Sequence, residues 1–157
     1  MSKFVSGLLA VALLTAGSTA QAMGRVISND LSNCRSGPST LVQINGIKAS
    51  SGKIRVQSYR GTSADWLEKG RWLARIEVPA RAGSMTVCVP LPEAGVYGIA
   101  VRHDVNGNGK TDISKDGGGM SNNPSINIFN LGKPSYKKTA FSVGDAPRTI
   151  SISMKYM

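Results

Sequence analysis

Val96-Tyr-Gly-Ile-Ala-Val-Arg-His-Asp104 is the stretch that decides the fold, because its side chains alternate between two faces. One face carries the larger side chains Tyr97, Ile99, Val101 and His103. The other face carries Gly98, Ala100 and Arg102. Alternation with a period of two is typical of a strand that buries one face. The stretch is therefore predicted to be the central strand of a sheet.

Other segments show the same alternation or a short apolar run between turn residues. The predicted strands are Leu41–Ile44, Lys53–Tyr59, Leu73–Val78, Met85–Val89, Lys138–Val143 and Thr149–Tyr156. We expect an irregular lead-in before Ser39 and one or two helical turns over Thr62–Lys69. Gly117–Gly119 is a tract of one residue type with no such pattern. Frequent turns and almost no helical period predict an all-β fold, an antiparallel sandwich of about seven strands.

Residues 1–22 are predicted to be a cleavable signal peptide. Lys3 supplies a positive start, residues 4–14 are largely apolar, and Ala20-Gln-Ala22 has the small-x-small pattern that signal peptidase cuts. The apolar run is too short to span a bilayer, so no membrane span is expected. Removing 22 of the 157 residues leaves 135, enough for a single β-sandwich domain over residues 23–157 in the periplasm or outside the cell.

The chain is strongly basic. Without Lys3, 18 of its 19 Lys and Arg residues face 9 Asp and Glu residues, a net charge of about +9. In an exported protein this favours anionic envelope components as partners over nucleic acid, and the basic residues are scattered rather than grouped with aromatics. The alternative is a solvated positive surface that only maintains solubility.

Cys34 and Cys88 are the only cysteines. An even count in an oxidising compartment predicts a disulfide between them. It would tie the irregular lead-in to a strand near the middle of the chain and stabilise the fold by about 3–5 kcal/mol. A catalytic or metal-binding thiol pair would be expected to show Cys-x-x-Cys spacing, which is absent.

Oxygen-bearing side chains recur at alternate positions directly after the central strand. Counting from Asp104, Asn106 and Asn108 take places three and five, Gly109 six, the Lys110 carbonyl seven and Asp112 nine. This order matches the first part of an EF-hand calcium loop. Place twelve, which should be a bidentate Glu, is Lys115. The pattern predicts at most a weak calcium site, with a dissociation constant of about 10⁻⁴–10⁻³ M.

A metal-free loop explains the same residues. Asn-Gly dipeptides at 106–107 and 108–109 are what tight turns require, because both residue types accept a positive φ. Asp104 would then bond only to amides of its own loop. The sequence leaves both alternatives open.

Nearly the whole chain after residue 22 resembles a family of small secreted bacterial proteins known only as a domain of unknown function, most specifically in its second half. The resemblance is carried by Gly-Val-Tyr97, His103-Asp104, the Asn-rich run to Asp112, Met120-Ser-Asn-Asn-Pro124 and the closing Ile150–Tyr156 strand. It implies a periplasmic sandwich of immunoglobulin-like or transthyretin-like shape and no particular activity. The chain departs from the family in having Met120 in place of an aromatic residue and in lacking a Gly-Ile-Pro-x-Glu element.

These observations predict a non-catalytic binding or structural module. A wider ligand-contacting loop would add His103, Asp116, Ser121, Asn122 and Asn123 to the calcium-binding positions. No catalytic residue is predicted, since the single histidine lacks a Gly-x-Ser-x-Gly partner motif and a zinc ligand set. Two alternatives remain. One is an envelope hydrolase that uses His103 with Asp104, and the other is a glycan-binding accessory domain that uses Trp66 or Trp72.

Overall fold

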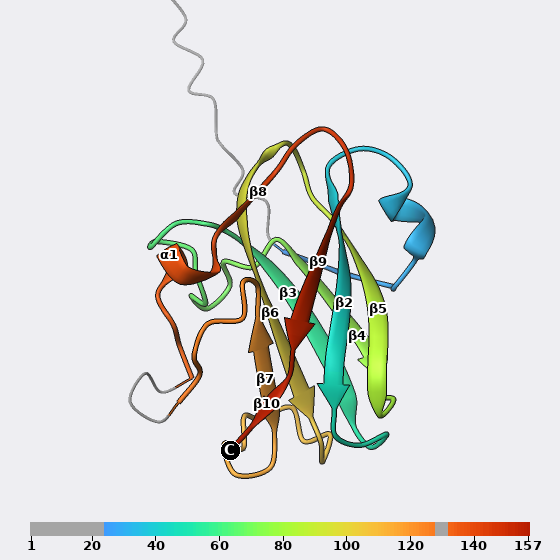
Figure 1. Ribbon diagram of the computed structural model, residues 1–157, viewed down its shortest axis with the longest axis vertical. Helices are drawn as coiled ribbons and strands as arrows, with labels where there is room; N and C mark the ends of the chain where they lie inside the picture. The colour runs from blue at the N-terminus through green and yellow to red at the C-terminus, as the bar shows by residue number, and fades with distance from the viewer. Residues whose placement is uncertain (1–23, 128–131) are drawn as a thin grey trace, which may run out of the picture.

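The computed structural model describes residues 24–127 and 132–157, and their regular secondary structure is almost entirely β-strand (Figure 1). The predicted signal peptide lies outside the described residues. The elements, in chain order, are β1 (Arg25–Ile27), the 3₁₀-helix η1 (Leu31–Cys34), β2 (Ser39–Ile47), β3 (Lys53–Arg60), β4 (Ala74–Pro79), β5 (Gly83–Pro90), β6 (Gly95–Asp104), β7 (Gly117–Met120), α1 (Tyr136–Thr139), β8 (Phe141–Val143), β9 (Arg148–Ser153) and β10 (Lys155–Tyr156).

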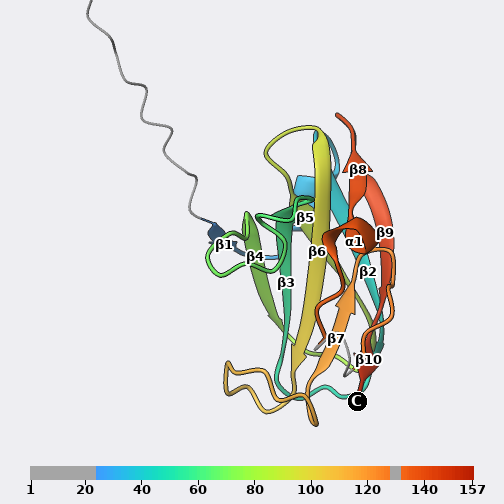
Figure 2. The same ribbon diagram turned by 90° about the vertical axis from the view of Figure 1, so that its left-hand side faces the viewer.

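The strands form two sheets. The larger has the order β1-β4-β3-β6-β7-β10, with β8 paired to one end of β6, and the smaller has the order β5-β2-β9. Viewed from the side, β3 and β6 lie in one layer and β2 and β9 in the other (Figure 2). The all-β prediction is confirmed, and the central position expected for residues 96–104 is that of β6.

Not every pair is antiparallel. β1 runs parallel to β4, and β2 runs parallel to β9, with Thr40 opposite Arg148. The prediction of a wholly antiparallel sandwich is therefore wrong, and the described residues form ten strands rather than about seven. The partners in the β2–β9 pair are more than a hundred residues apart, and pairing between such distant segments leaves no local sequence signal.

The core lies between the sheets. Alternate residues of β3, β4 and β6 are completely buried, and so are alternate residues of β2 and β5: Val56, Ile76, Ile99, Val42, Ile44 and Val87. Burying side chains of this size contributes about 1.5–3 kcal/mol each. The residues between them along β3, β4 and β6 point to the outer face of the larger sheet, among them Arg55, Arg75 and Arg102.

The C-terminal segment passes from one sheet to the other. β9 pairs with β2, and after Met154 the chain continues as β10, which pairs with β7. Gly119 makes room for this crossing, because a Cβ there would lie 2.7 Å from Cγ2 of Ile152. A Cβ on Gly117 would likewise meet the Tyr156 ring. The glycine tract is thus a strand with side chains packed over it.

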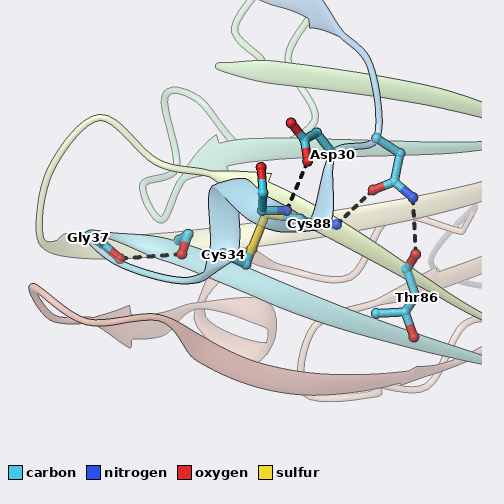
Figure 3. Close-up of a disulfide and its surroundings, with 8 residues drawn as sticks. Asp30, Cys34, Gly37, Thr86 and Cys88 are labelled. Carbon is cyan, nitrogen blue, oxygen red and sulfur yellow. Dashed lines mark hydrogen bonds between the residues drawn. A yellow bond between two sulfur atoms is a disulfide. The ribbon is translucent and has the colours of Figure 1, made fainter.

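The Cys34–Cys88 disulfide joins η1 to β5, as the sequence predicts (Figure 3). Asp30 caps η1 by accepting a hydrogen bond from the Ser32 amide at 2.9 Å. Asn29 donates to the Thr86 carbonyl at 3.1 Å and accepts from the Cys88 amide at 3.0 Å. The two Asn29 bonds satisfy backbone groups on the free edge of β5, which would otherwise be open to another strand.

Two predicted elements differ from the structure. Residues 62–69 form turns rather than a helix, with a single helix-type bond from the Trp66 amide to the Thr62 carbonyl at 3.1 Å. The strand expected from Lys138 begins only at Phe141, after the short helix α1. Within the described parts of the chain, no helix is long and apolar enough to span a bilayer.

Candidate cation-binding loop

The loop predicted to bind calcium connects two neighbouring strands. β6 ends at Asp104 and β7 begins at Gly117, and the two strands are antiparallel. We refer to residues 104–116 as the Asp/Asn loop. In the side view it projects from the end of the larger sheet, away from β2 and β9 (Figure 2). It is therefore held at both ends by a rigid strand, the usual arrangement for a ligand-binding loop.

Asp104 lies at the root of the loop and is 4% exposed. Its Oδ2 atom accepts a hydrogen bond from the Gly109 amide at 2.8 Å, and Nη2 of Arg102 lies 3.5 Å from the same oxygen. Its Oδ1 atom is also buried and has no hydrogen-bond partner among the described residues. A buried carboxylate oxygen without a donor or a cation is costly. Asp104 Oδ1 is therefore an unsatisfied buried acceptor at the root of the loop.

Gly109 has a φ of +77°, a conformation that side chains disfavour, and this turns its amide toward Asp104. The two asparagines form consecutive Asx turns: Asn106 Oδ1 accepts from the Asn108 amide at 3.2 Å, and Asn108 Oδ1 accepts from the Lys110 amide at 2.7 Å. The loop therefore contains the side-chain to backbone hydrogen bonds that a metal-free tight turn would have.

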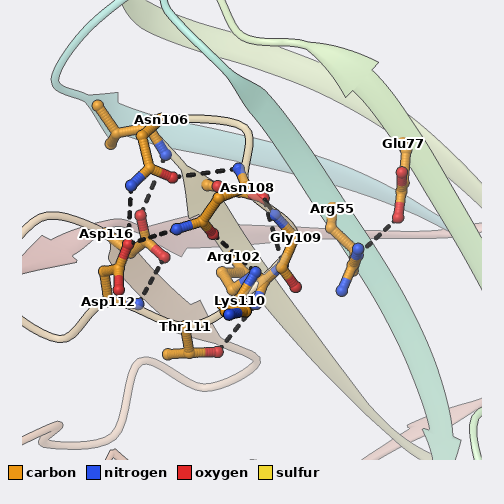
Figure 4. A network of polar contacts seen from close by, with 12 residues as sticks. Arg55, Glu77, Arg102, Asn106, Asn108, Gly109, Lys110, Thr111, Asp112 and Asp116 are labelled. Atoms are coloured by element: carbon orange, nitrogen blue, oxygen red, sulfur yellow. Dashed lines mark hydrogen bonds and ion pairs between the residues drawn. The ribbon is translucent and has the colours of Figure 1, made fainter.

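The two asparagine side chains also converge on Asp112 (Figure 4). Their Nδ2 groups donate to Oδ2 of Asp112 at 2.7 and 2.8 Å. These two hydrogen bonds, followed in effect by the charges of Lys115 and Lys110, hold the pKa of Asp112 below its usual value. Three polar side chains therefore meet on one side of the loop, with the amide nitrogens of the two asparagines directed at the Asp112 carboxylate, which is ionised at neutral pH.

Asp116 closes the neck of the loop. It is 7% exposed, and its two oxygens accept from the Val105 amide at 3.1 Å and from the Asp112 amide at 2.9 Å. Both oxygens are thus occupied by the main chain. Asp116 fixes the shape of the loop and does not replace the glutamate that an EF-hand has at place twelve.

Arg102 is a residue of this site that the sequence reading missed. It stands two residues before Asp104 on the outer face of β6. Its guanidinium donates to Thr111 Oγ1 at 2.8 Å and to the Gly109 carbonyl at 3.1 Å (Figure 4). Arg102 thereby folds the loop against the sheet. In the sequence, the one indication of this role is that residues 102 and 104 are two apart in a strand and so lie on the same face.

The charges of the loop limit what it can bind. Asp104, Asp112 and Asp116 are balanced by Arg102 and two exposed lysines, Lys110 and Lys115. Within residues 24–127 and 132–157, no three Asp, Glu, His or Cys side chains are grouped as a ready metal site. A cation would therefore depend on amide and main-chain oxygens as well as carboxylates, a donor set that suits a hard ion such as Ca²⁺.

His103 lies beside the loop but faces the core and is completely buried. Its Nε2 lies 2.8 Å from the Ser51 carbonyl and its Nδ1 lies 2.7 Å from the Tyr156 hydroxyl. Since a carbonyl only accepts, Nε2 carries the hydrogen, and in the neutral ring the tyrosine donates to Nδ1. Both ring nitrogens are engaged in joining β6 to the β2–β3 turn and to β10.

Ser121, Asn122 and Asn123 follow the opposite end of β7 from the loop. Ser121 accepts from the Ile99 amide at 3.0 Å and donates to the Thr139 carbonyl at 2.6 Å. Asn122 donates to the Ala140 carbonyl at 2.9 Å. Asn123 bonds to Ser151 and Ser153 of β9 at 3.0 and 2.7 Å. The structure therefore does not bring these three residues to the Asp/Asn loop, and their bonds join segments of the fold.

A comparison with protein families matches residues 42–151 to the family described as "Uncharacterized protein conserved in bacteria (DUF2141)". The match begins within β2, includes β3 to β8 and the Asp/Asn loop, and ends within β9. No curated protein and no solved structure gives a match.

Proposed function

Because this chain belongs to that bacterial family of uncharacterized proteins, we propose its function from the site alone: it is an exported, non-catalytic binding or structural module of the cell envelope whose Asp/Asn loop binds calcium. We further propose that the sandwich is of immunoglobulin-like or transthyretin-like type. Two sheets packed over a shared core support that assignment.

The observation that carries the calcium proposal is the unpartnered, buried Oδ1 of Asp104. The other oxygen of this carboxylate is taken by the Gly109 amide, which leaves Oδ1 alone to meet a ligand. A metal-free turn explains the hydrogen bonds of the loop, but it leaves the buried Oδ1 of Asp104 without a partner. A divalent cation would satisfy it.

The loop offers further oxygens. An amide oxygen has two lone pairs, so Asn106 Oδ1 and Asn108 Oδ1 each keep an acceptor position while they cap the turn. Asp112 supplies a second carboxylate once a cation replaces the two amide donors at its Oδ2. The Lys110 carbonyl completes the set in the EF-hand order. With little net negative charge the site should be weak, as in extracellular modules.

Export is supported by the signal-like residues 1–22 and by the Cys34–Cys88 disulfide. A weak calcium site suits such a compartment, since extracellular modules work at dissociation constants of about 10⁻⁴–10⁻³ M. The positive net charge favours anionic envelope components as partners.

The alternatives have less support. A hydrolase would need an accessible imidazole, whereas His103 is completely buried with both nitrogens bonded. A glycan-binding face would need exposed indoles. Trp66 is buried with its Nε1 donating to the Pro134 carbonyl at 2.8 Å, and Trp72 lies under the guanidinium of Arg75. Both tryptophans have structural partners.

Thermal melting with and without calcium tests the proposal. We expect calcium at millimolar concentration to raise the melting temperature of the mature protein, and Asp104→Asn to abolish the rise. Asp145→Asn is the matched control, because it removes an exposed carboxylate outside the loop. A melting temperature indifferent to calcium, in a protein whose circular dichroism shows a folded sheet, would contradict the proposal.

A further inference from the structure

A groove of about 750 Å³ crosses the outer face of the larger sheet over β3, β4, β6 and β7. Arg55, Arg75 and Arg102 line it from three different strands. We call it the arginine groove. The three arginines alternate along their strands with buried core residues, so the strand pattern itself directs them outward.

The strand register brings these arginines together. Arg55 stands directly opposite Arg102 in the β3–β6 pair, and Arg75 stands opposite Gln57 in the β3–β4 pair. Figure 4 shows Arg55 and Arg102 on neighbouring strands. Like charges placed directly opposite one another repel and destabilise a sheet. Glu77, which stands opposite Arg55 in the β3–β4 pair, offsets part of this repulsion.

The guanidinium groups are only partly satisfied by the protein. The side chains of Arg55 and Arg102 are 21% and 18% exposed. Arg55 pairs with Glu77 at 2.7 Å, but Arg75 lies against the Trp72 ring at 4.4 Å. Nε of Arg75 and Nε of Arg102 are buried without a hydrogen-bond partner in the part of the chain that the structure describes. Buried N–H groups of a cation favour an anion beside them.

The charge around the groove supports an anionic ligand. Its lining contains six Lys and Arg residues and two Asp and Glu residues, Glu68 and Asp116. Asp116 already accepts two main-chain hydrogen bonds. Burial, and next the charge of Arg55, lower the pKa of Arg75 from its ordinary value. An anion would relieve this repulsion.

Part of the groove is apolar. Tyr59, Leu67, Trp72, Met120 and Ile126 line it. Tyr59 and Met120 belong to a small hydrophobic cluster with Trp66, against which Leu67, Trp72 and Ile126 pack. A ligand that covers these residues would remove apolar surface from water.

We propose that the arginine groove binds a carboxylate with an apolar body, of which a medium-chain fatty acid is the simplest example. The carboxylate lies among Arg55, Arg75 and Arg102, where planar guanidinium groups match its two oxygens. The hydrocarbon chain lies on the partly exposed Leu67, Trp72 and Ile126, beneath which Tyr59 and Met120 are buried. A volume of about 750 Å³ falls within the range of pockets that take small molecules.

This inference does not rest on cation binding by the Asp/Asn loop. Arg102 and the loop residues Thr111, Ile113 and Asp116 line the groove as well, but the loop bonds of Arg102 are formed without a cation. Arg55 and Arg75 project from β3 and β4, which do not carry the loop. The groove can therefore be tested with calcium removed, and failure of either proposal leaves the other standing.

Titration calorimetry of the mature protein with sodium decanoate, in EDTA and below the micelle concentration, tests the inference. We expect saturable binding and a change in tryptophan fluorescence from Trp72. Arg75→Gln should weaken decanoate binding by about tenfold or more, because a charge-assisted hydrogen bond is lost. Arg81→Gln removes an exposed arginine outside the groove and should leave the affinity unchanged.

Two control ligands separate the contribution of the carboxylate to affinity from that of the hydrocarbon chain. Acetate, which lacks the chain, and decanol, which lacks the charge, should each bind much more weakly than decanoate. Decanol binding as tightly as decanoate would overturn the proposal, and so would equal affinities for the Arg75→Gln and Arg81→Gln variants. Tighter binding of decyl phosphate would overturn the assignment of a carboxylate. If the folded protein does not bind decanoate, the proposal that the arginine groove is a binding site is wrong.

Discussion

His103 and Tyr156 join the central strand to the C-terminal strand through a 2.7 Å hydrogen bond between Nδ1 and the phenol oxygen. The same phenol accepts from the Lys48 amide at 3.0 Å. One hydroxyl thus satisfies the backbone amide at the start of the β2–β3 connection and a nitrogen of a completely buried imidazole. The rings also meet edge to face, with centroids 5.8 Å apart.

Tyr156→Phe should therefore destabilise the fold. It keeps the ring but removes the hydroxyl, which leaves the His103 nitrogen and the Lys48 amide without this partner. Leaving a buried polar group unsatisfied costs about 1–3 kcal/mol. Urea unfolding at neutral pH measures the loss, and Tyr136→Phe is the control because, among the described residues, its hydroxyl makes no comparable bond between strands. Equal stabilities of the two variants would contradict the role given to this contact.

Stability should fall in alkaline solution. Burial raises the pKa of Tyr59, Tyr97 and Tyr156 above the ordinary value of 10.0. Below pH 10 these phenols are neutral in both the folded and the unfolded chain, so the stabilisation is complete. As the pH rises past 10, the unfolded chain ionises first, and the free energy of unfolding decreases. Urea unfolding between pH 8 and pH 11 measures the slope, which Tyr156→Phe should reduce.

Replacing both cysteines by serine should destabilise the protein strongly. The disulfide closes a separation of 54 residues, which corresponds to about 4 kcal/mol in the chain-entropy picture. It also holds η1 over the edge of β5. Urea unfolding of Cys34→Ser/Cys88→Ser against the oxidised parent measures this difference. A loss below about 1 kcal/mol would show that the N-terminal segment is held by other contacts.

The glycine tract of β7 allows a matched comparison. Gly119→Ala should destabilise the fold by about 1–3 kcal/mol, since the added methyl group would overlap Ile152. At the neighbouring Gly118 the nearest atom to an added Cβ is 4.0 Å away. Gly118→Ala should therefore be neutral or slightly stabilising. Urea unfolding of both variants measures the difference, and equal effects would contradict the packing described for the crossing strand.

The strands that the sequence predicts best are those with clean alternation. β3 and β6 lie within a residue of the predicted bounds, because one face of each is buried and the other is not. β7 was not predicted, since three successive glycines have no alternating side chains. The break at Met154 was missed because Ile150, Ile152, Met154 and Tyr156 continue one alternation while the backbone changes sheet. β1 is too short to give a pattern.

The parts of the Asp/Asn loop that could be predicted are those in which residues close together in the sequence determine the backbone conformation. The Asx turns at Asn106 and Asn108 and the sharp turn at Gly109 follow from local sequence. Arg102 was missed because its contacts exist only once the loop folds back on the sheet. The arginine groove was missed for a related reason: Arg55, Arg75 and Arg102 are far apart in the chain and meet through strand register alone.

A crystal structure of the mature protein grown in calcium tests the central claim most directly. The account predicts an ion in the Asp/Asn loop with Asp104 Oδ1 at about 2.3–2.6 Å, and amide oxygens of Asn106 and Asn108 turned toward it. A map at saturating calcium in which Asp104 Oδ1 meets only water or protein atoms would contradict it.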